Sequence, residues 1–153
     1  MLFTLSLGDW MQDGNCVHED YLFDCNYPVE QIAEAYKASC RKYGVQFNSA
    51  DNDYIDPASD NRSERESWRH IWGRYDSNLD PTAYVVLEQA GVLDSDNVVK
   101  AVDGSGFYVD DEAGLVMRFI ALSMPKDFSY KLVEVPSLNR ELRVNICYGL
   151  SAV

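Results

Sequence analysis

Alternating apolar and polar residues predict two strands near the start of the chain. Residues 3–7, FTLSL, and residues 21–26, YLFDCN, both follow a period of two, as expected for strands with one buried face. Residues 13–15, Asp-Gly-Asn, lie between them, and these residue types tolerate the backbone conformations of a tight turn. The pattern predicts an N-terminal β-hairpin whose strands extend toward Met11 and Val17.

Residues 28–44, PVEQIAEAYKASCRKYG, carry the clearest helix signal. Apolar side chains recur there every three or four residues and form one continuous stripe. The stripe consists of Val29, Ile32, Ala33, Tyr36, Cys40 and Tyr43. Pro28 suits the first helical position and Gly44 suits the residue after the last one. We expect this helix to pack on the hairpin.

Two more helices are predicted in the middle of the chain. Ser63 and Glu66 have the spacing of a capping box at the start of residues 63–75, SERESWRHIWGRY. Residues 80–91, DPTAYVVLEQAG, begin with Asp-Pro and end at Gly91, which leaves Val92 placed for a hydrophobic cap contact. Residues 95–102 carry a weaker helical pattern, whereas the Asp-rich residues 48–61 are typical of a loop.

Residues 107–124, FYVDDEAGLVMRFIALSM, admit two interpretations. A helix that starts at Asp111 would place Leu115, Phe119 and Leu122 on one side. A hairpin is the favoured interpretation, because residues 111–114 have turn composition and separate two apolar runs. Periodicity alone does not distinguish a helix from a strand in such short runs.

The last part of the chain is predicted to form strands. Residues 124–127 break the pattern, residues 128–135 read as a strand, residues 136–139 as a turn, and residues 141–150 as a last strand. The whole pattern predicts one α+β domain, residues 1–153. Its mostly antiparallel sheet joins the N-terminal hairpin to the C-terminal strands, with three to four helices packed on one face. We also expect the terminal strands to meet.

Composition and charge narrow the classes of function. The chain has no 18-residue apolar run and no basic segment at its start, so we expect a cytoplasmic protein without a membrane role. Its net charge of −12 opposes nucleic-acid binding, because phosphate backbones are repelled. The same charge favours solubility, and it also suits a basic partner or a protein that imitates DNA.

Residues 8–20, GDWMQDGNCVHED, resemble a metal or catalytic site in composition. Cys16, His18 and Asp20 would share one face of a strand. They provide at most three ligands, and the other histidine, His70, lies far along the chain. We therefore expect a solvated hairpin turn, with no metal and no cofactor. No motif supplies a histidine-activated nucleophile with an orienting third group, which argues against an enzyme.

The strongest candidate for a binding site lies in residues 62–75. Its ligand- or partner-binding residues are predicted to be Arg65, Trp68, Arg69, Trp72 and Tyr75. Tryptophan, tyrosine and arginine dominate binding hot spots. The competing interpretation is that the tryptophans fill the core while the arginines pair with the Asp-rich loop, because tryptophan is highly buried on average.

These patterns predict an acidic binding or accessory protein that acts without a cofactor on a protein partner. An inhibitor, an immunity-type protein or the product of a mobile element would fit. The alternatives are a small hydrolase-like enzyme that uses carboxylates with His18 or His70, and a small-ligand-binding domain with an aromatic and Arg-lined pocket. A homodimer is narrowly favoured, because residues 1–7 and 142–153 would be poorly protected sheet edges. Pairing of these two segments with each other is the competing arrangement.

Overall fold

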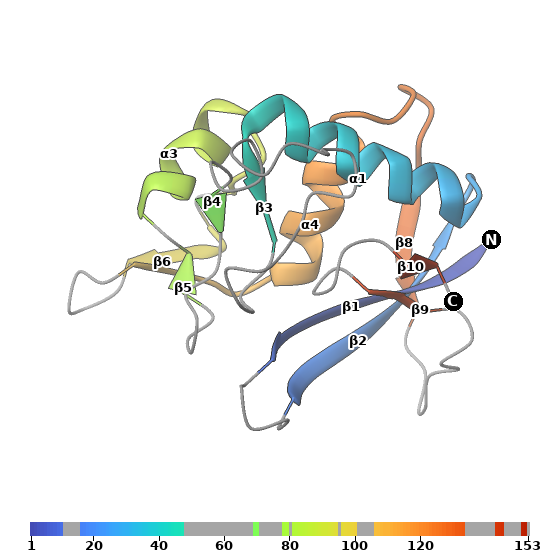
Figure 1. Cartoon of the computed structure of the whole chain (residues 1–153), viewed down its shortest axis with the longest axis horizontal. Coiled ribbons are helices and arrows are strands. Elements are labelled where there is room, and N and C mark those ends of the chain that lie inside the picture. Colours follow the sequence, from blue (N-terminus) through green and yellow to red (C-terminus); the bar gives the residue numbers. More distant parts are fainter. Residues whose placement is uncertain are drawn as a thin grey trace, which may run out of the picture.

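The computed structural model of this chain shows an α+β fold, as predicted (Figure 1). The part of the chain that it describes consists of residues 1–10, 16–47, 69–70, 78–79, 81–94, 96–100, 106–133, 143–145 and 151–152. This part contains three helices, one five-stranded sheet and two smaller sheets. Figure 1 shows α1 and α4 on the same side of the five-stranded sheet.

The main sheet joins both ends of the chain. Its strands are β1 (Leu2–Trp10), β2 (Cys16–Cys25), β8 (Tyr130–Val133), β9 (Arg143–Asn145) and β10 (Ser151–Ala152), in the order β10-β9-β1-β2-β8. β1 and β2 form the predicted antiparallel hairpin, and β9 pairs with β1 in parallel. The predicted meeting of the terminal strands is therefore confirmed. It places β1 inside the sheet and removes one of the two edges on which the dimer expectation was based.

Helix α1 (Val29–Tyr43) confirms the first apolar stripe. Ile32, Ala33, Tyr36 and Cys40 are all buried. The helix ends at Gly44, whose φ of 66° is left-handed and whose N–H donates to the Cys40 carbonyl at 2.8 Å. The expectation for Pro28 was wrong by one residue. Pro28 is the N-cap with an extended backbone (ψ 150°), so the helix begins after it.

Helix α3 (Pro81–Gln89) ends as its sequence predicts. Gly91 has a φ of 76°. Its N–H donates to the Glu88 carbonyl at 3.0 Å, and the Val92 N–H donates to the Leu87 carbonyl at 3.2 Å. These two bonds form a Schellman motif. Leu87 and Val92 are both buried, which supplies the expected hydrophobic cap contact.

A second sheet replaces the weak helix predicted for residues 95–102. Its strands are β5 (Asn78–Leu79), β6 (Val98–Lys100) and β7 (Phe107–Val109), in the order β5-β7-β6. The helix prediction was wrong because β-branched residues at 98 and 99 pair with β7, and such residues favour strands. Tyr84 of α3 stacks on Phe107, with ring centroids 4.1 Å apart.

The favoured hairpin over residues 107–124 was also wrong, and the alternative helix is correct. Helix α4 (Glu112–Ala121) begins at Asp111, whose Oδ1 accepts a hydrogen bond from the Gly114 N–H at 2.9 Å. What resembled a turn is therefore a helix cap. Six residues of the helix are buried: Ala113, Leu115, Val116, Met117, Phe119 and Ile120. Gly114, Arg118 and Ala121 share a side that is not buried, and only Arg118 among them is charged, so the helical period is hard to see in the sequence.

The helix predicted for residues 63–75 does not run through Arg69 and His70. These two residues form β4 (Arg69–His70), which pairs in parallel with β3 (Val45–Gln46). Because α1 stops at Gly44, the chain continues directly into β3, where Val45 is fully buried. The rest of residues 63–75, the loop at residues 48–61, and the turns at residues 13–15 and 136–139 lie outside the described residues.

Phe119 of α4 lies at the centre of an aromatic cluster. Its ring contacts Tyr36 and Tyr43 of α1, with centroids 6.3 and 6.1 Å away, and Phe47 at 5.2 Å. The Phe47 N–H also donates to the Tyr36 hydroxyl at 3.0 Å. The cluster joins α1, the chain after β3, and α4. On the other side of the main sheet, Thr4 and Leu22 are buried as well. Among the described helices, none is long and apolar enough to cross a membrane.

We expect Asp111→Ala to destabilise the protein by about 1 kcal/mol, because it removes the side-chain cap of α4. Asp111→Asn is the matched control, since asparagine caps helices about as well as aspartate does. Urea unfolding of the two variants measures the difference. Equal losses of stability in both variants would mean that the charge matters and the cap does not.

We expect the Cys40 thiol to resist modification in the folded protein. Only 3% of Cys40 is exposed, and a buried structural thiol is shielded from reagents. Mass spectrometry after a brief treatment with iodoacetamide would locate the modified cysteines, with the unfolded protein as the reference. Rapid labelling of Cys40 in the native state would contradict the position of the α1 stripe.

Candidate functional site

A pocket of about 240 Å³ opens between the main sheet and the beginning of α4. Its described lining residues are Tyr21, Phe23, Asp111, Ala113, Gly114, Arg118, Tyr130, Lys131 and Leu132. They come from three segments that are far apart in the sequence. The floor is aromatic, and the two charged groups on the helix side are Asp111 and Arg118.

Strand register explains the aromatic floor. Phe23 lies opposite Leu132 in the β2–β8 pair, and Cys25 lies opposite Tyr130. Side chains two residues apart share one face of a strand, so Tyr130 and Leu132 face the helices together with Phe23. The rings of Phe23 and Tyr130 meet edge to face, with centroids 6.0 Å apart. Leu132 is 54% exposed and stands at the rim.

Gly114 allows the Asp111 carboxylate to fold back onto the helix. A Cβ at Gly114 would lie 2.0 Å from Asp111 Oδ2, so a larger residue there would require the carboxylate to shift from its present position. Glycine leaves room for the carboxylate as it lies here. Gly114 also contributes no side chain to the helix wall of the pocket beside Ala113.

Arg118 is the polar group held most firmly in the pocket wall. Its Nε donates to the Val92 carbonyl at 2.8 Å, just beyond the end of α3. The bond fixes the guanidinium against α3 while Arg118 still lines the pocket. Arginine presents five N–H donors, so this one bond does not exhaust its capacity.

Burial raises the pKa of the Tyr130 hydroxyl above its ordinary value. Two charges in the pocket act on it in opposite directions: the positive charge of Arg118 lowers the pKa and the negative charge of Asp111 raises it. Tyr130 is therefore a neutral hydroxyl at physiological pH, able to donate one hydrogen bond and to accept others.

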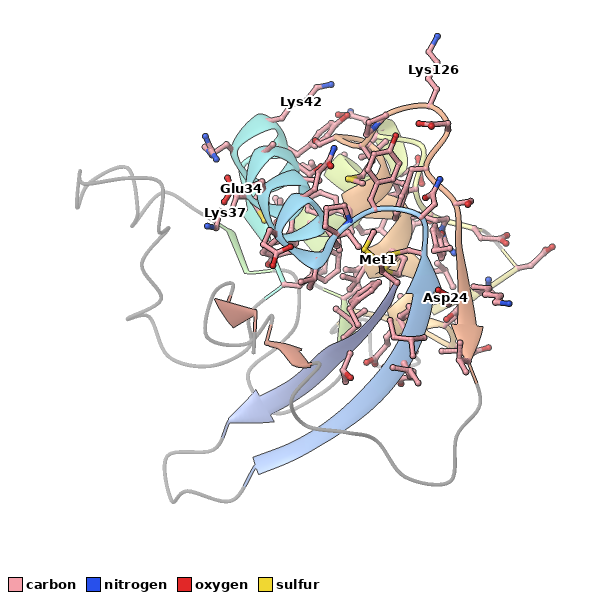
Figure 2. All side chains as sticks on the ribbon, turned by 90° about the vertical axis from the view of Figure 1, so that its right-hand side faces the viewer. Met1, Asp24, Glu34, Lys37, Lys42 and Lys126 are labelled. Carbon is pink, nitrogen blue, oxygen red and sulfur yellow. The ribbon has the colours of Figure 1, made fainter. Side chains whose placement is uncertain are left out.

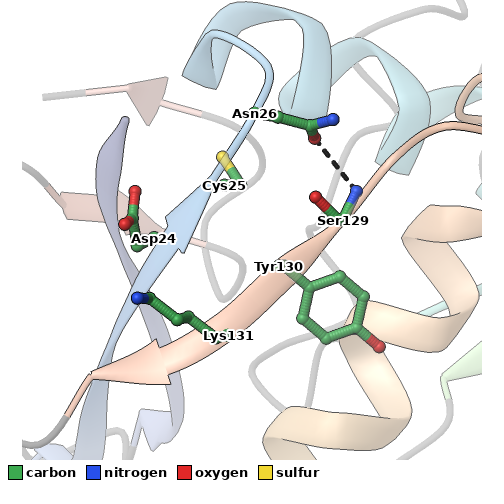
Figure 3. Close-up of a pocket in the computed structure, with 6 residues that line it drawn as sticks. All are labelled: Asp24, Cys25, Asn26, Ser129, Tyr130 and Lys131. Atoms are coloured by element: carbon green, nitrogen blue, oxygen red, sulfur yellow. Dashed lines mark hydrogen bonds between the residues drawn. The ribbon is translucent and has the colours of Figure 1, made fainter.

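A second hollow, of about 400 Å³, lies at the other side of the first residues of β8 (Figure 3). It is lined by Asp24, Cys25, Asn26, Ser129, Tyr130 and Lys131. Figure 3 shows the Tyr130 ring directed toward α4, whereas the Lys131 side chain extends over β2 beside Asp24. The two hollows share Tyr130 and Lys131 and so lie on either side of β8.

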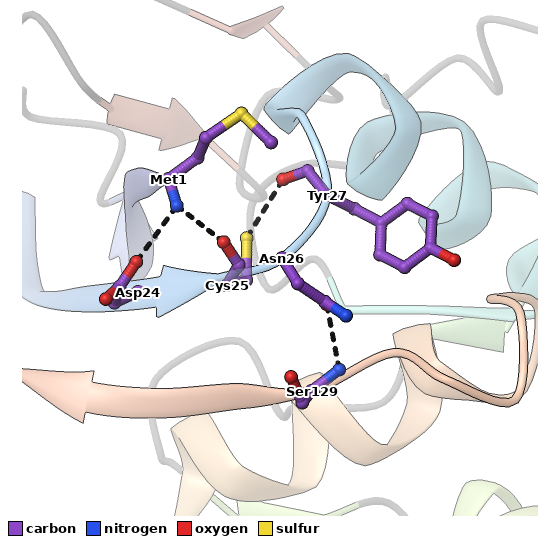
Figure 4. Close-up of polar contacts among 6 residues, drawn as sticks. All are labelled: Met1, Asp24, Cys25, Asn26, Tyr27 and Ser129. Atoms are coloured by element: carbon purple, nitrogen blue, oxygen red, sulfur yellow. Dashed lines mark hydrogen bonds and ion pairs between the residues drawn. The ribbon is translucent and has the colours of Figure 1, made fainter.

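Polar contacts within this second hollow serve to hold the chain together. The Asn26 side chain accepts from the Ser129 N–H at 2.9 Å and donates to the Asp127 carbonyl at 2.8 Å. The Met1 ammonium donates to Asp24 and to the Cys25 carbonyl (Figure 4). Because these groups bond one another, we assign the second hollow to structure rather than to ligand binding.

The predicted binding residues fall almost entirely outside the part of the chain that the structure describes. Arg65, Trp68, Trp72 and Tyr75 lie outside the described residues, and Arg69 is placed only by its pairing with Val45 in the β3–β4 ladder. The segment therefore stays a prediction.

The metal-like stretch proves to be mostly strand. Residues 8–10 and 16–20 extend β1 and β2, with His18 opposite Gly8 and Cys16 opposite Trp10. The turn expected between them, residues 11–15, lies outside the described residues. Within the described part of the chain, no group of three or more His, Cys, Asp or Glu residues is arranged to hold a metal ion.

The pocket was not predicted from the sequence, although the position of Arg118 pointed to it. Arg118 is the only charged residue in the apolar residues 113–125. A charge in such a run is rarely buried without a partner, and here the partner is a backbone carbonyl. Comparisons with protein-family models, curated proteins and solved structures found no match to this chain.

We expect two pocket variants to move the Tyr130 pKa in opposite directions. Asp111→Asn should lower it by removing a nearby negative charge, and Arg118→Gln should raise it by removing a positive one. Titration of isotope-labelled tyrosine by NMR, with Tyr130→Phe for assignment, measures both shifts. Because the pKa of Tyr130 is raised in the folded state, its contribution to the free energy of unfolding is complete below about pH 10. This contribution is lost as the pH rises through the pKa of the folded state. Shifts in the same direction would mean that the two charges do not face Tyr130.

Proposed function

We propose that this chain is a binding protein that acts without a cofactor and recognises a protein partner. One large apolar side chain of the partner enters the pocket between β8 and α4. The observation that carries the proposal is the pocket itself, with Phe23 and Tyr130 in its floor and the exposed Leu132 at its rim.

The size of the pocket supports an anchor side chain over a whole small molecule. Small-molecule sites usually measure about 300–1,000 Å³ and bury most of their ligand. This pocket, at about 240 Å³, is smaller. Single aromatic or aliphatic side chains that fill a pocket commonly supply most of the binding energy of a protein interface.

Charges around the pocket indicate the partner's composition. Asp110, Asp111 and Glu112 follow one another where the chain enters α4, and Asp111 lines the pocket. The whole chain carries a net charge of −12. Arg118 and Lys131 also line the pocket, so its acidic side is the start of α4. Complementary charge favours encounter and fixes orientation, so basic residues that meet the start of α4 would fit this surface.

The pocket's chemistry supports binding over hydrolysis. Among the described residues that line it, none is a histidine, a serine or a cysteine. Arg118 and the Tyr130 hydroxyl would orient a bound group by hydrogen bonds. A hydrolase needs an activated nucleophile or water, and neither Arg118 nor a neutral phenol is a base. The carboxylate in the lining, Asp111, is engaged as the cap of α4 through the Gly114 N–H.

We expect peptides selected by the native protein from a phage-displayed random library to carry a large apolar residue flanked by basic ones. Leu132→Asp should weaken their binding about tenfold or more, because it removes an apolar rim contact and places a strongly hydrated carboxylate where the apolar anchor has to enter. Isothermal titration of synthetic peptides measures the change. Val85→Asp is the matched control, since Val85 of α3 is similarly exposed (53%) and does not line the pocket.

The proposal would be wrong if no peptide binds above background, or if Leu132→Asp and Val85→Asp weaken binding equally. NMR shift changes on peptide addition should centre on Ala113, Tyr130 and Leu132. Changes centred on another surface would likewise contradict it.

A further inference from the structure

We infer that the partner binds as an extended segment that adds a strand to the outer edge of β8, hydrogen-bonded to the backbone of Tyr130 and Leu132. This inference rests on the proposed function and specifies the shape of the partner. It follows from the position of β8 in the sheet, the direction of its backbone groups, and the side chains that share its pocket-facing side.

β8 is the last strand in the order of the main sheet. It pairs with β2 on one side, and no described strand pairs with its other side. Figure 2 shows β8 at the outer border of the sheet, away from β9 and β10. An edge strand presents a row of backbone donors and acceptors that another chain can join.

The register decides which backbone groups face outward. The Cys25 N–H donates to the Met1 carbonyl at 2.9 Å, and the Met1 ammonium donates to the Cys25 carbonyl, so the Cys25 backbone points toward β1. Backbone direction alternates along a strand. Asp24, next to Cys25, and Leu22, two residues before Asp24, therefore point their backbone groups toward β8.

Asp24 lies opposite Lys131, and Leu22 lies opposite Val133. In an antiparallel ladder, every second pair of opposite residues exchanges two N–H···O=C hydrogen bonds. Lys131 and Val133 belong to such pairs, so their N–H and C=O groups point toward β2. Tyr130 and Leu132 consequently direct their N–H and C=O groups to the free edge.

The residues that offer backbone groups at the edge also line the pocket. Tyr130 and Leu132 both do so, with their side chains on the helix-facing side of the sheet. A residue paired opposite Leu132 on an added strand would project toward the same side. Strand addition gains affinity from the main chain and specificity from pockets for alternate side chains, and β8 combines both features.

Charge argues that the added strand comes from a different protein and not from a second copy. Two copies would each carry a net charge of −12. Antiparallel pairing of two β8 strands centred on residue 131, which matches Tyr130 of each with Leu132 of the other, would also set Lys131 directly opposite its own equivalent, and like charges at such positions are destabilising. A basic segment of another protein meets neither obstacle if its apolar anchor lies opposite Leu132 and its basic residues lie away from Lys131.

Leu132→Pro and Leu132→Ala separate the backbone contribution from the side-chain contribution. Both variants shorten the rim side chain, but only proline removes the outward N–H, and an edge strand tolerates proline where its N–H faces solvent. We expect the library-selected peptides to bind Leu132→Pro about tenfold more weakly than Leu132→Ala. Lys131→Pro, which removes an inward N–H, should instead lower the stability of the fold.

A second measurement does not depend on how the proline variant folds. Peptides methylated at single backbone nitrogens are titrated into the unaltered protein. Loss of binding at alternate positions is expected of an added strand, because only every second N–H bonds to β8. Insensitivity to methylation at every position, or a helical bound peptide by NMR, would overturn the inference.

The outcomes distinguish this inference from the function on which it rests. Equal binding to Leu132→Pro and Leu132→Ala, with loss in Leu132→Asp, would overturn strand addition while the anchor pocket stands. Binding that is insensitive to all three variants would overturn both. Sedimentation that detects a dimer abolished by Leu132→Pro would show that a second copy occupies the edge, and would overturn the assignment to a different protein.

Discussion

The burial of α4 is the constraint on which the rest of this fold depends. Of its ten residues, six are buried, and they cover most of the helix circumference. So wide an apolar face has to be enclosed by other elements. The rings of Tyr36, Tyr43 and Phe47 enclose it around Phe119. The main sheet supplies Phe23 and Tyr130 below its first turn, where the pocket lies.

Two polar residues fix α4 within this apolar surrounding, and both belong to the pocket. Asp111 caps the first turn through the Gly114 N–H, and Arg118 bonds the carbonyl at the end of α3. Asp111 is exposed and Arg118 is half-buried. A side-chain helix cap is worth about 1 kcal/mol and a hydrogen bond to a charged group roughly 1.5–3 kcal/mol, so these bonds stabilise the helix as well as position it. The pocket is thus the place where the enclosed helix meets the edge of the sheet, and its charges have structural roles in addition to the binding role that we propose.

β1 and β8 are protected from unwanted strand pairing in different ways. β1, with no charged side chain before Asp9, is placed between β2 and β9 and offers no free edge. β8 is short, carries Lys131 and ends the sheet. Short length and lysine are common protections of an edge strand against indiscriminate pairing. Under the proposed mode of binding, such an edge accepts a segment that also fills the pocket and matches the surrounding charge.

Local patterns in the sequence determined the β1–β2 hairpin, helix α1 and the Schellman end of α3. Each depends on neighbours within one turn or one strand, for which the spacing of apolar residues and the placement of glycine are sufficient. The sequence did not determine α4, because the side that is not buried, made of Gly114, Arg118 and Ala121, carries only one charged residue and so gives little visible period. It also suggested a helix through Arg69 and His70, which instead pair with β3, since a two-residue parallel strand depends wholly on its partner. The pocket was decided only by the tertiary structure. Its walls come from residues 21–23, 111–118 and 130–132, and only the packing of α4 against β2 and β8 brings such distant segments together.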